Sequence, residues 1–200
     1  NEQPESESIS SLTKICSSLQ SLSYQIRDNN TRKQVTQIPK LLQSLSALSL
    51  YRLGIHLRED IDQQRLEVRS RSRWYLRYIQ EKCDKQVQTE LVNNGYGRVM
   101  SLSFSTAGGK GEGRNKEIEI GLMNISDFVR ELHQGRNNYY GQPPFQPLPL
   151  LARNTEEQME EEGANEEVET QMNNYGWFSE MKSNAKWAKA MIINRFIYKR

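Results

Sequence analysis

The densest group of cationic side chains in the sequence is a set of four arginines. Arg65, Arg69, Arg73 and Arg77 follow one another at intervals of four residues, so a helix would align them along one ridge. Aligned guanidinium groups repel one another, and each presents a planar set of donors that fits phosphate or carboxylate. The ridge is therefore expected to bind phosphate, to bind an acidic protein surface, or to remain solvated with its charges paired by nearby carboxylates.

A glycine-rich segment, residues 108–115, is the second cationic candidate. A nucleotide-binding P-loop needs a longer spacing before its lysine, and a Ser or Thr and a helix after it. The position of Lys110 does not meet that pattern. We expect a mobile hairpin tip, or alternatively a basic finger in which Lys110, Arg114 and Lys116 contact nucleic acid or a protein.

Groups suited to catalysis or to metal binding are sparse. The sequence contains two histidines, His56 and His133, and two cysteines, Cys16 and Cys83. Their spacing matches no metal-ligand motif, and no Ser or Cys lies in a nucleophile motif. We therefore predict that the protein is not an enzyme, and we expect no metal, no cofactor and no small-molecule substrate.

The arginine ridge belongs to the last of three expected helices. Apolar residues recur at steps of three and four over residues 9–26 and again over 35–48, which indicates two amphipathic helices. A turn near Gly54 would precede a long helix over about residues 58–92. A helical hairpin plus this long helix, residues 1–95, is the predicted first domain.

The next segment, residues 96–135, is predicted to contain a β-hairpin and a short helix. Polar and apolar residues alternate over residues 98–106 and 116–122, as in two strands with one apolar face. The short helix is expected to begin at Ser126 as its N-cap and to end before Gly135.

Residues 136–174 are predicted to be an unstructured linker. Four prolines fall within residues 142–150, and eight glutamates without any basic residue fall within residues 154–170. Densely spaced like charges with little apolar surface are typical of disorder. Without those eight glutamates, 27 basic residues face 17 acidic ones, so the acidic segment is a candidate internal screen for the basic surfaces.

The last segment, residues 175–200, is predicted to be a basic amphipathic helix. It is expected to pack on its own domain, to enter a groove on another protein, or, less favoured, to lie on a membrane surface. The residues expected to contact a partner are its large apolar side chains: Trp177, Phe178, Met181, Trp187, Ile192 and Phe196.

Composition limits the remaining possibilities. The net charge is +2, and no uncharged run is long enough to cross a bilayer. Two cysteines and the absence of a signal-like segment favour an intracellular site, cytoplasmic or nuclear, with an organelle still open because a segment before Asn1 can have been removed. The expected fold is mostly α, of the α+β class.

The combined features favour one function over another. We expect a non-catalytic structural or adaptor subunit of a larger protein assembly that binds its partners through amphipathic helices. The alternative is a nucleic-acid-binding accessory protein that uses the arginine ridge and the basic finger, with an affinity that falls steeply as salt rises.

Overall fold

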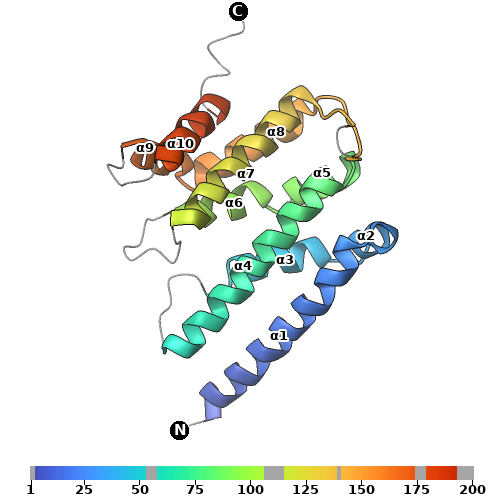
Figure 1. The fold of residues 1–200 in the computed structure, drawn as a ribbon, viewed down its shortest axis with the longest axis vertical. Coiled ribbons are helices and arrows are strands. Elements are labelled where there is room, and N and C mark those ends of the chain that lie inside the picture. Colours follow the sequence, from blue (N-terminus) through green and yellow to red (C-terminus); the bar gives the residue numbers. More distant parts are fainter. Residues whose placement is uncertain (1–2, 53–57, 106–114, 139–140, 174–178, 193–200) are drawn as a thin grey trace, which may run out of the picture. The chain divides into compact units, whose positions relative to one another are not determined.

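A computed structural model describes residues 3–52, 58–105, 115–138, 141–173 and 179–192, with backbone alone at 3–9, 115–117 and 179–181. These residues form ten helices, and their one β-pairing is an isolated antiparallel bridge between Arg136 and Phe145. The predicted mostly-α class is confirmed. The chain divides into two compact units, unit 1 (Asn1–Cys83) and unit 2 (Asp84–Arg200) (Figure 1).

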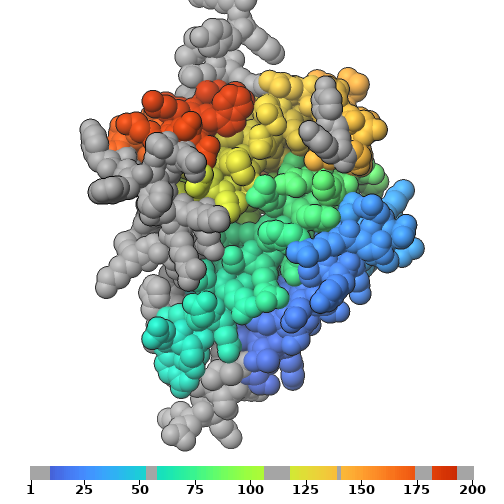
Figure 2. All heavy atoms as spheres, in the orientation of Figure 1, coloured from blue at the N-terminus to red at the C-terminus, as the bar shows by residue number. Residues whose placement is uncertain are grey.

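Unit 1 is built from α1 (Gln3–Arg27), α2 (Asn29–Thr36), α3 (Leu41–Ser49) and α4 (Glu59–Lys82). The long helices α1 and α4 lie side by side, as Figures 1 and 2 show, and α3 packs against α4. Both long helices bury apolar residues seven positions apart, which is a helical repeat. The buried sets are Leu12, Leu19 and Ile26 on α1 and Ile61, Val68 and Tyr75 on α4.

Two of the expected helices are interrupted. The helix predicted over residues 35–48 is divided between α2 and α3, because Pro39 disfavours helical backbone in the residue before it and Lys40 takes a left-handed φ of 64°. The helix predicted over residues 58–92 ends at Lys82. The Asp84 side chain accepts hydrogen bonds from the backbone N–H groups of the second and third residues of the next helix, and so caps it.

Unit 2 is built from α5 (Lys85–Asn93), α6 (Tyr96–Phe104), α7 (Asn115–Gln134), α8 (Pro149–Glu161), α9 (Ala164–Asn173) and α10 (Ser179–Ile192). Helix α7 contacts α6, α8 and α10, while α9 contacts α8 and α10. The rings of Tyr96 and Phe128 meet edge to face in the core, with centroids 4.9 Å apart. Large apolar residues from the helices complete that core: Phe104, Leu122, Leu132, Met159 and Val168.

The predicted β-hairpin is wrong: its first strand lies in α6 and its second strand in α7. In α6, serines produce the alternation of polar and apolar residues that predicted a strand. Ser101 Oγ donates to the Gly97 carbonyl at 2.9 Å, and Ser103 Oγ donates to the Met100 carbonyl at 2.6 Å. A serine that bonds to its own helix can be buried, so its polarity does not mark a solvent-facing position.

The residues of the second predicted strand, 116–122, belong to a longer helical repeat in α7. Seven residues were too few to reveal that repeat. Ile118, Leu122, Ile125 and Val129 are all buried at helical spacing along α7. Ser126, the predicted N-cap, lies buried inside this helix, where its Oγ donates to the Leu122 carbonyl at 2.6 Å. The predicted stop is confirmed, since α7 ends at Gln134 and Gly135 has a φ of +78°.

The unstructured acidic segment is also a wrong prediction, because residues 149–161 and 164–173 form α8 and α9. Pro149 takes the first position of α8, where its missing N–H costs nothing. Met159 and Val168 are completely buried. Arg98 on α6 pairs with Glu161 and Glu162. The number of glutamates overestimates the repulsion among them. The helices separate the glutamates from the apolar face, and Arg98 from α6 offsets part of their charge.

Candidate interaction surface

The arginine ridge does not form an exposed cationic surface. Arg65 and Arg69 are each only 1% exposed. The Arg65 guanidinium lies 3.6 Å from the Asp62 carboxylate, and Arg69 Nη1 donates to the Tyr51 carbonyl at 3.0 Å. Tyr51 follows the C-terminal end of α3, where backbone carbonyls lack helical partners. Arg69 therefore stabilises the end of α3 from the neighbouring α4.

The other two arginines of the ridge are partly accessible. Arg77 Nε donates to Glu81 Oε1 at 2.7 Å, an i,i+4 ion pair on α4, and Arg73 is half-buried. The predicted pairing by local carboxylates therefore describes Arg77 well. Of the predicted basic finger, Lys110 and Arg114 lie outside the described residues, and only the backbone of Lys116 is described, in α7.

Helix α10 packs within unit 2. Ala185, Ala188 and Ile192 are buried, and Lys189 Nζ lies 2.7 Å from Glu169 on α9. Ile192 is thus a core residue in this structure, whereas Trp187 is 43% exposed. The other predicted partner contacts, Trp177, Phe178 and Phe196, lie outside the described residues, as does the side chain of Met181.

A cluster that the sequence did not single out lies on unit 1. The Trp74 and Tyr78 rings, one turn apart on α4, stack with centroids 5.2 Å apart and planes 20° apart. Tyr75 meets Trp74 edge-on, and its hydroxyl donates to the Leu19 carbonyl of α1 at 2.7 Å. This buried hydrogen bond fixes the position of α1 beside the stacked rings.

Two arginines from the end of α1 and from α2 lie over those rings. The Arg27 guanidinium carbon is 4.8 Å from the Trp74 ring centroid, and that of Arg32 is 5.3 Å from the Tyr78 centroid. Both distances are within the range of cation–π attraction. Tyr24, one turn before Arg27 on α1, is 74% exposed. We call Tyr24, Arg27, Arg32, Trp74 and Tyr78 the arginine–aromatic surface.

The two arginines of this surface differ in their bonding. Arg32 donates to the Ile26 carbonyl at 2.8 Å, to the Arg27 carbonyl at 3.0 Å and to the Tyr78 hydroxyl at 3.3 Å. It therefore caps the C-terminal end of α1. Within the described part of the chain, the Arg27 side chain makes no hydrogen bond or ion pair besides its contact with the ring, and it is exposed to solvent.

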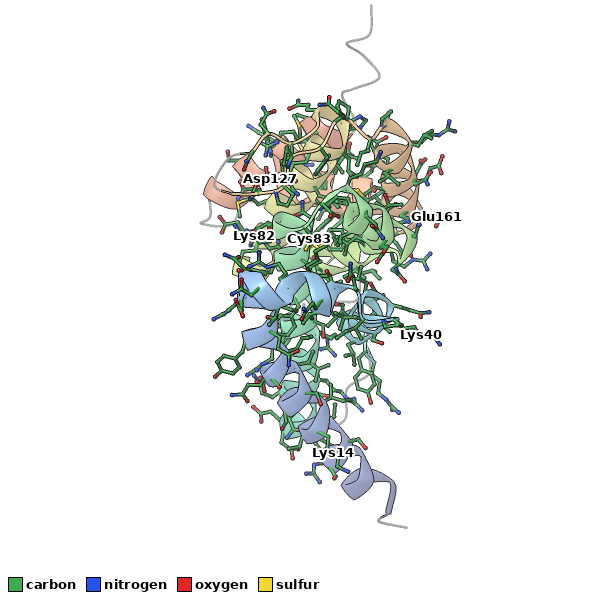
Figure 3. All side chains as sticks on the ribbon, turned by 90° about the vertical axis from the view of Figure 1, so that its right-hand side faces the viewer. Lys14, Lys40, Lys82, Cys83, Asp127 and Glu161 are labelled. Atoms are coloured by element: carbon green, nitrogen blue, oxygen red, sulfur yellow. The ribbon has the colours of Figure 1, made fainter. Side chains whose placement is uncertain are left out.

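Two titratable groups elsewhere in unit 1 have shifted pKa values. Figure 3 shows Lys14 and Lys82 at different places along unit 1. Beside α4, burial and the Glu67 carboxylate raise the pKa of the Cys16 thiol, while Arg71 lowers it. At the start of α4, a hydrogen bond from Arg58 lowers the pKa of Asp60.

One pair in unit 2 has the residue types of an acid–base site. His133 Nε2 lies 2.6 Å from Glu156 Oε1, with both side chains mostly buried between α7 and α8. Among the described residues, Glu156 is the one hydrogen-bond partner of His133, so no hydroxyl or thiol completes a nucleophilic triad there. Nor do any three described His, Cys, Asp or Glu side chains group closely enough to hold a metal ion.

None of the five residues of the arginine–aromatic surface was among the contact residues predicted from the sequence. The available signal was an aromatic and a basic residue, Tyr24 and Arg27, three positions apart near the end of the first predicted helix. The sequence does not show that this helix end lies beside Trp74. None of the described helices is both long enough and apolar enough to traverse a bilayer. The chain matches no family model, no curated protein and no solved structure.

Proposed function

We propose that the protein is a non-catalytic adaptor subunit that binds a protein partner through the arginine–aromatic surface. The observation that carries this proposal is the stack of Trp74 and Tyr78 beneath Arg27 and Arg32, with Trp74 37% exposed. Trp, Tyr and Arg are the residues that dominate binding energy at protein interfaces. Because neighbouring contacts already hold these side chains, ordering them on binding costs little entropy.

The bonding of the surface favours acceptor groups on the partner. Neither the Arg27 guanidinium nor the Trp74 indole N–H is hydrogen-bonded within the described residues, so both can donate to an incoming carboxylate or carbonyl. A partner segment that combines an acidic residue with apolar side chains would satisfy these donors and also cover Tyr24.

Two observations argue for a protein over a nucleic acid. Nucleic-acid bases bind aromatic residues by stacking on open ring faces, but the Trp74 and Tyr78 faces already contact each other and the two arginines. Arg65 and Arg69 of the predicted phosphate-binding ridge are buried. The nucleic-acid alternative therefore has fewer accessible cations than the sequence indicated.

Photo-crosslinking in cells tests the proposal. A benzoyl-phenylalanine placed at Tyr24 should crosslink to one defined protein, and Trp74→Ala should abolish the product while helicity by circular dichroism is retained. The same group at Gln43, an exposed position on α3, is the matched control. Equal labelling from both positions would reject the surface, and a nuclease-sensitive product would favour the nucleic-acid alternative.

A further inference from the structure

A second surface lies on unit 2, where a proline-rich segment connects α7 to α8 (Figure 1). We call residues 142–148 the proline strap. Arg136 and Phe145 exchange two backbone hydrogen bonds, of 2.8 and 3.0 Å. The Arg136 guanidinium lies 4.7 Å from the Phe145 ring centroid, and its Nε donates to the Pro143 carbonyl at 3.0 Å. One arginine thus holds the strap through backbone, ring and carbonyl contacts.

The strap is also fixed against the end of α7. The Leu148 N–H donates to the Leu132 carbonyl at 2.7 Å. A Cβ on Gly135 would come within 2.6 Å of the Phe145 carbonyl oxygen and 3.1 Å of Pro147 Cδ. Only glycine permits this close approach. The strap is therefore a packed part of unit 2, although its composition predicted a linker.

The two buried residues of the strap lie three positions apart. Phe145 and Leu148 are 8% and 9% exposed, whereas Pro144 and Pro147 are exposed. A polyproline II helix has three residues per turn, so residues three apart share a side. Proline fixes its own φ and restricts the preceding residue to extended backbone. Phe145 and Leu148 thus pack inward, while Pro144 and Pro147, which are also three residues apart, remain accessible.

We propose that Pro144 and Pro147 form a preorganised ligand for a partner domain whose groove is lined with aromatic side chains. Such grooves recognise two prolines separated by two residues, and the rigid polyproline II conformation lowers the entropic cost of binding. Leu150, the second residue of α8, is 77% exposed and adds accessible apolar surface next to the strap. The contacts of Arg136 provide the preorganisation that a free peptide lacks.

The inference does not depend on the proposed function, since the proline strap and the arginine–aromatic surface share no residue. If both surfaces bind, the chain would link two different proteins, as an adaptor does. Trp74→Ala should leave binding by the strap unchanged, and changes in the strap should leave crosslinking from Tyr24 unchanged. Failure of one proposal is therefore distinguishable from failure of the other.

The test is binding of the full chain to immobilised, purified SH3, WW and EVH1 domains, which are domains with aromatic grooves. We expect at least one domain to bind, and the double substitution P144A/P147A to weaken that binding by at least about tenfold. Gln146→Ala, an exposed position between the two prolines, is the matched control and should have little effect. Absence of binding throughout the panel, or equal losses in both variants, would overturn the proposal.

A second variant separates recognition from folding of the strap. Arg136→Ala keeps both prolines and the backbone pairing with Phe145 but removes the guanidinium contacts with the Phe145 ring and the Pro143 carbonyl, so affinity should fall several-fold without being abolished. Amide hydrogen exchange at Phe145 and Leu148 reports whether the strap is still packed in each variant. If P144A/P147A retains this protection yet loses binding, the prolines themselves are recognised. If P144A/P147A loses binding and also loses the amide protection, the prolines only support the fold and the proposal fails.

Discussion

Gln158 on α8 accepts a hydrogen bond from the backbone N–H of Gly97 on α6, at a distance of 3.1 Å. The same side-chain amide donates to the Val92 carbonyl in the last turn of α5, at 2.8 Å. Helix ends leave backbone groups without partners inside the helix, and one glutamine here satisfies a group at the end of α5 and another at the start of α6. This explains how a glutamate-rich helix becomes part of the folded unit 2.

Gly97→Ala should destabilise unit 2 by about 2 kcal/mol. A Cβ at this position would lie 3.0 Å from both Gln158 Oε1 and the Thr155 carbonyl oxygen, so α6 and α8 would have to separate. Denaturant unfolding measures the loss. Gly95→Asn is the matched control, because no atom lies within 4 Å of that Cβ position and asparagine tolerates the left-handed φ of 75°. Equal losses in the two variants would contradict the close contact.

Substitutions of the two arginines of the arginine–aromatic surface should have different effects on stability and on binding. Arg32→Ala removes donors to the Ile26 and Arg27 carbonyls and should destabilise unit 1 by about 1–2 kcal/mol. Arg27→Ala should change stability by less than about 0.5 kcal/mol, yet abolish the crosslink from Tyr24. Thermal unfolding and the crosslinking assay measure the two effects. A large loss of stability in Arg27→Ala would show that this residue is structural.

The Cys16 thiol should react slowly with alkylating reagents. Burial and the Glu67 carboxylate raise its pKa, so the reactive thiolate is scarce near pH 8. Glu67→Gln removes one cause, and the alkylation rate at Cys16 should rise. Arg71→Gln removes the cation that lowers the pKa, and the rate should fall. Rates measured in a Cys83→Ser background isolate Cys16, and a rate that falls in Glu67→Gln would contradict the assignment.

Asp60 should titrate below the ordinary range for an aspartate. Arg58 donates to both of its carboxylate oxygens, at 3.1 and 2.7 Å, and lowers the pKa of Asp60. A lowered folded-state pKa means that this group contributes stability above its unfolded pKa and loses it as the pH falls through the folded value. Carboxyl NMR shifts should show a low midpoint that Arg58→Gln raises towards the ordinary value, because backbone hydrogen bonds also lower the pKa of Asp60. An unchanged midpoint would exclude Arg58 as the cause.

Local sequence pattern was a good guide where one helix buries one face. Leu12, Leu19 and Ile26 were expected on a common stripe, and all three are buried. Gly135 was expected to end a helix, and it does. Both are properties of a short stretch of chain, because helical periodicity and a left-handed glycine need no information from distant residues.

Pattern was misleading where a polar residue has a partner that the sequence does not reveal. Ser101 and Ser103 resembled the outward face of a strand but are buried and bonded to carbonyls of their own helix. The glutamates of α8 and α9 resembled a disordered spacer, although Met159 and Val168 between them are completely buried. Whether a polar residue is solvated or packed depends on what covers it.

The sequence by itself determined the helical class, the apolar stripes and several helix ends, because these follow from spacing and from the backbone preferences of glycine, proline and small polar residues. Only the tertiary structure decided that Arg69 is buried against the Tyr51 carbonyl while Arg27 stays exposed over Trp74. The physical reason is that each contact joins residues far apart in the chain. The burial of a charge, and hence its availability to a partner, is set by the helix packed against it.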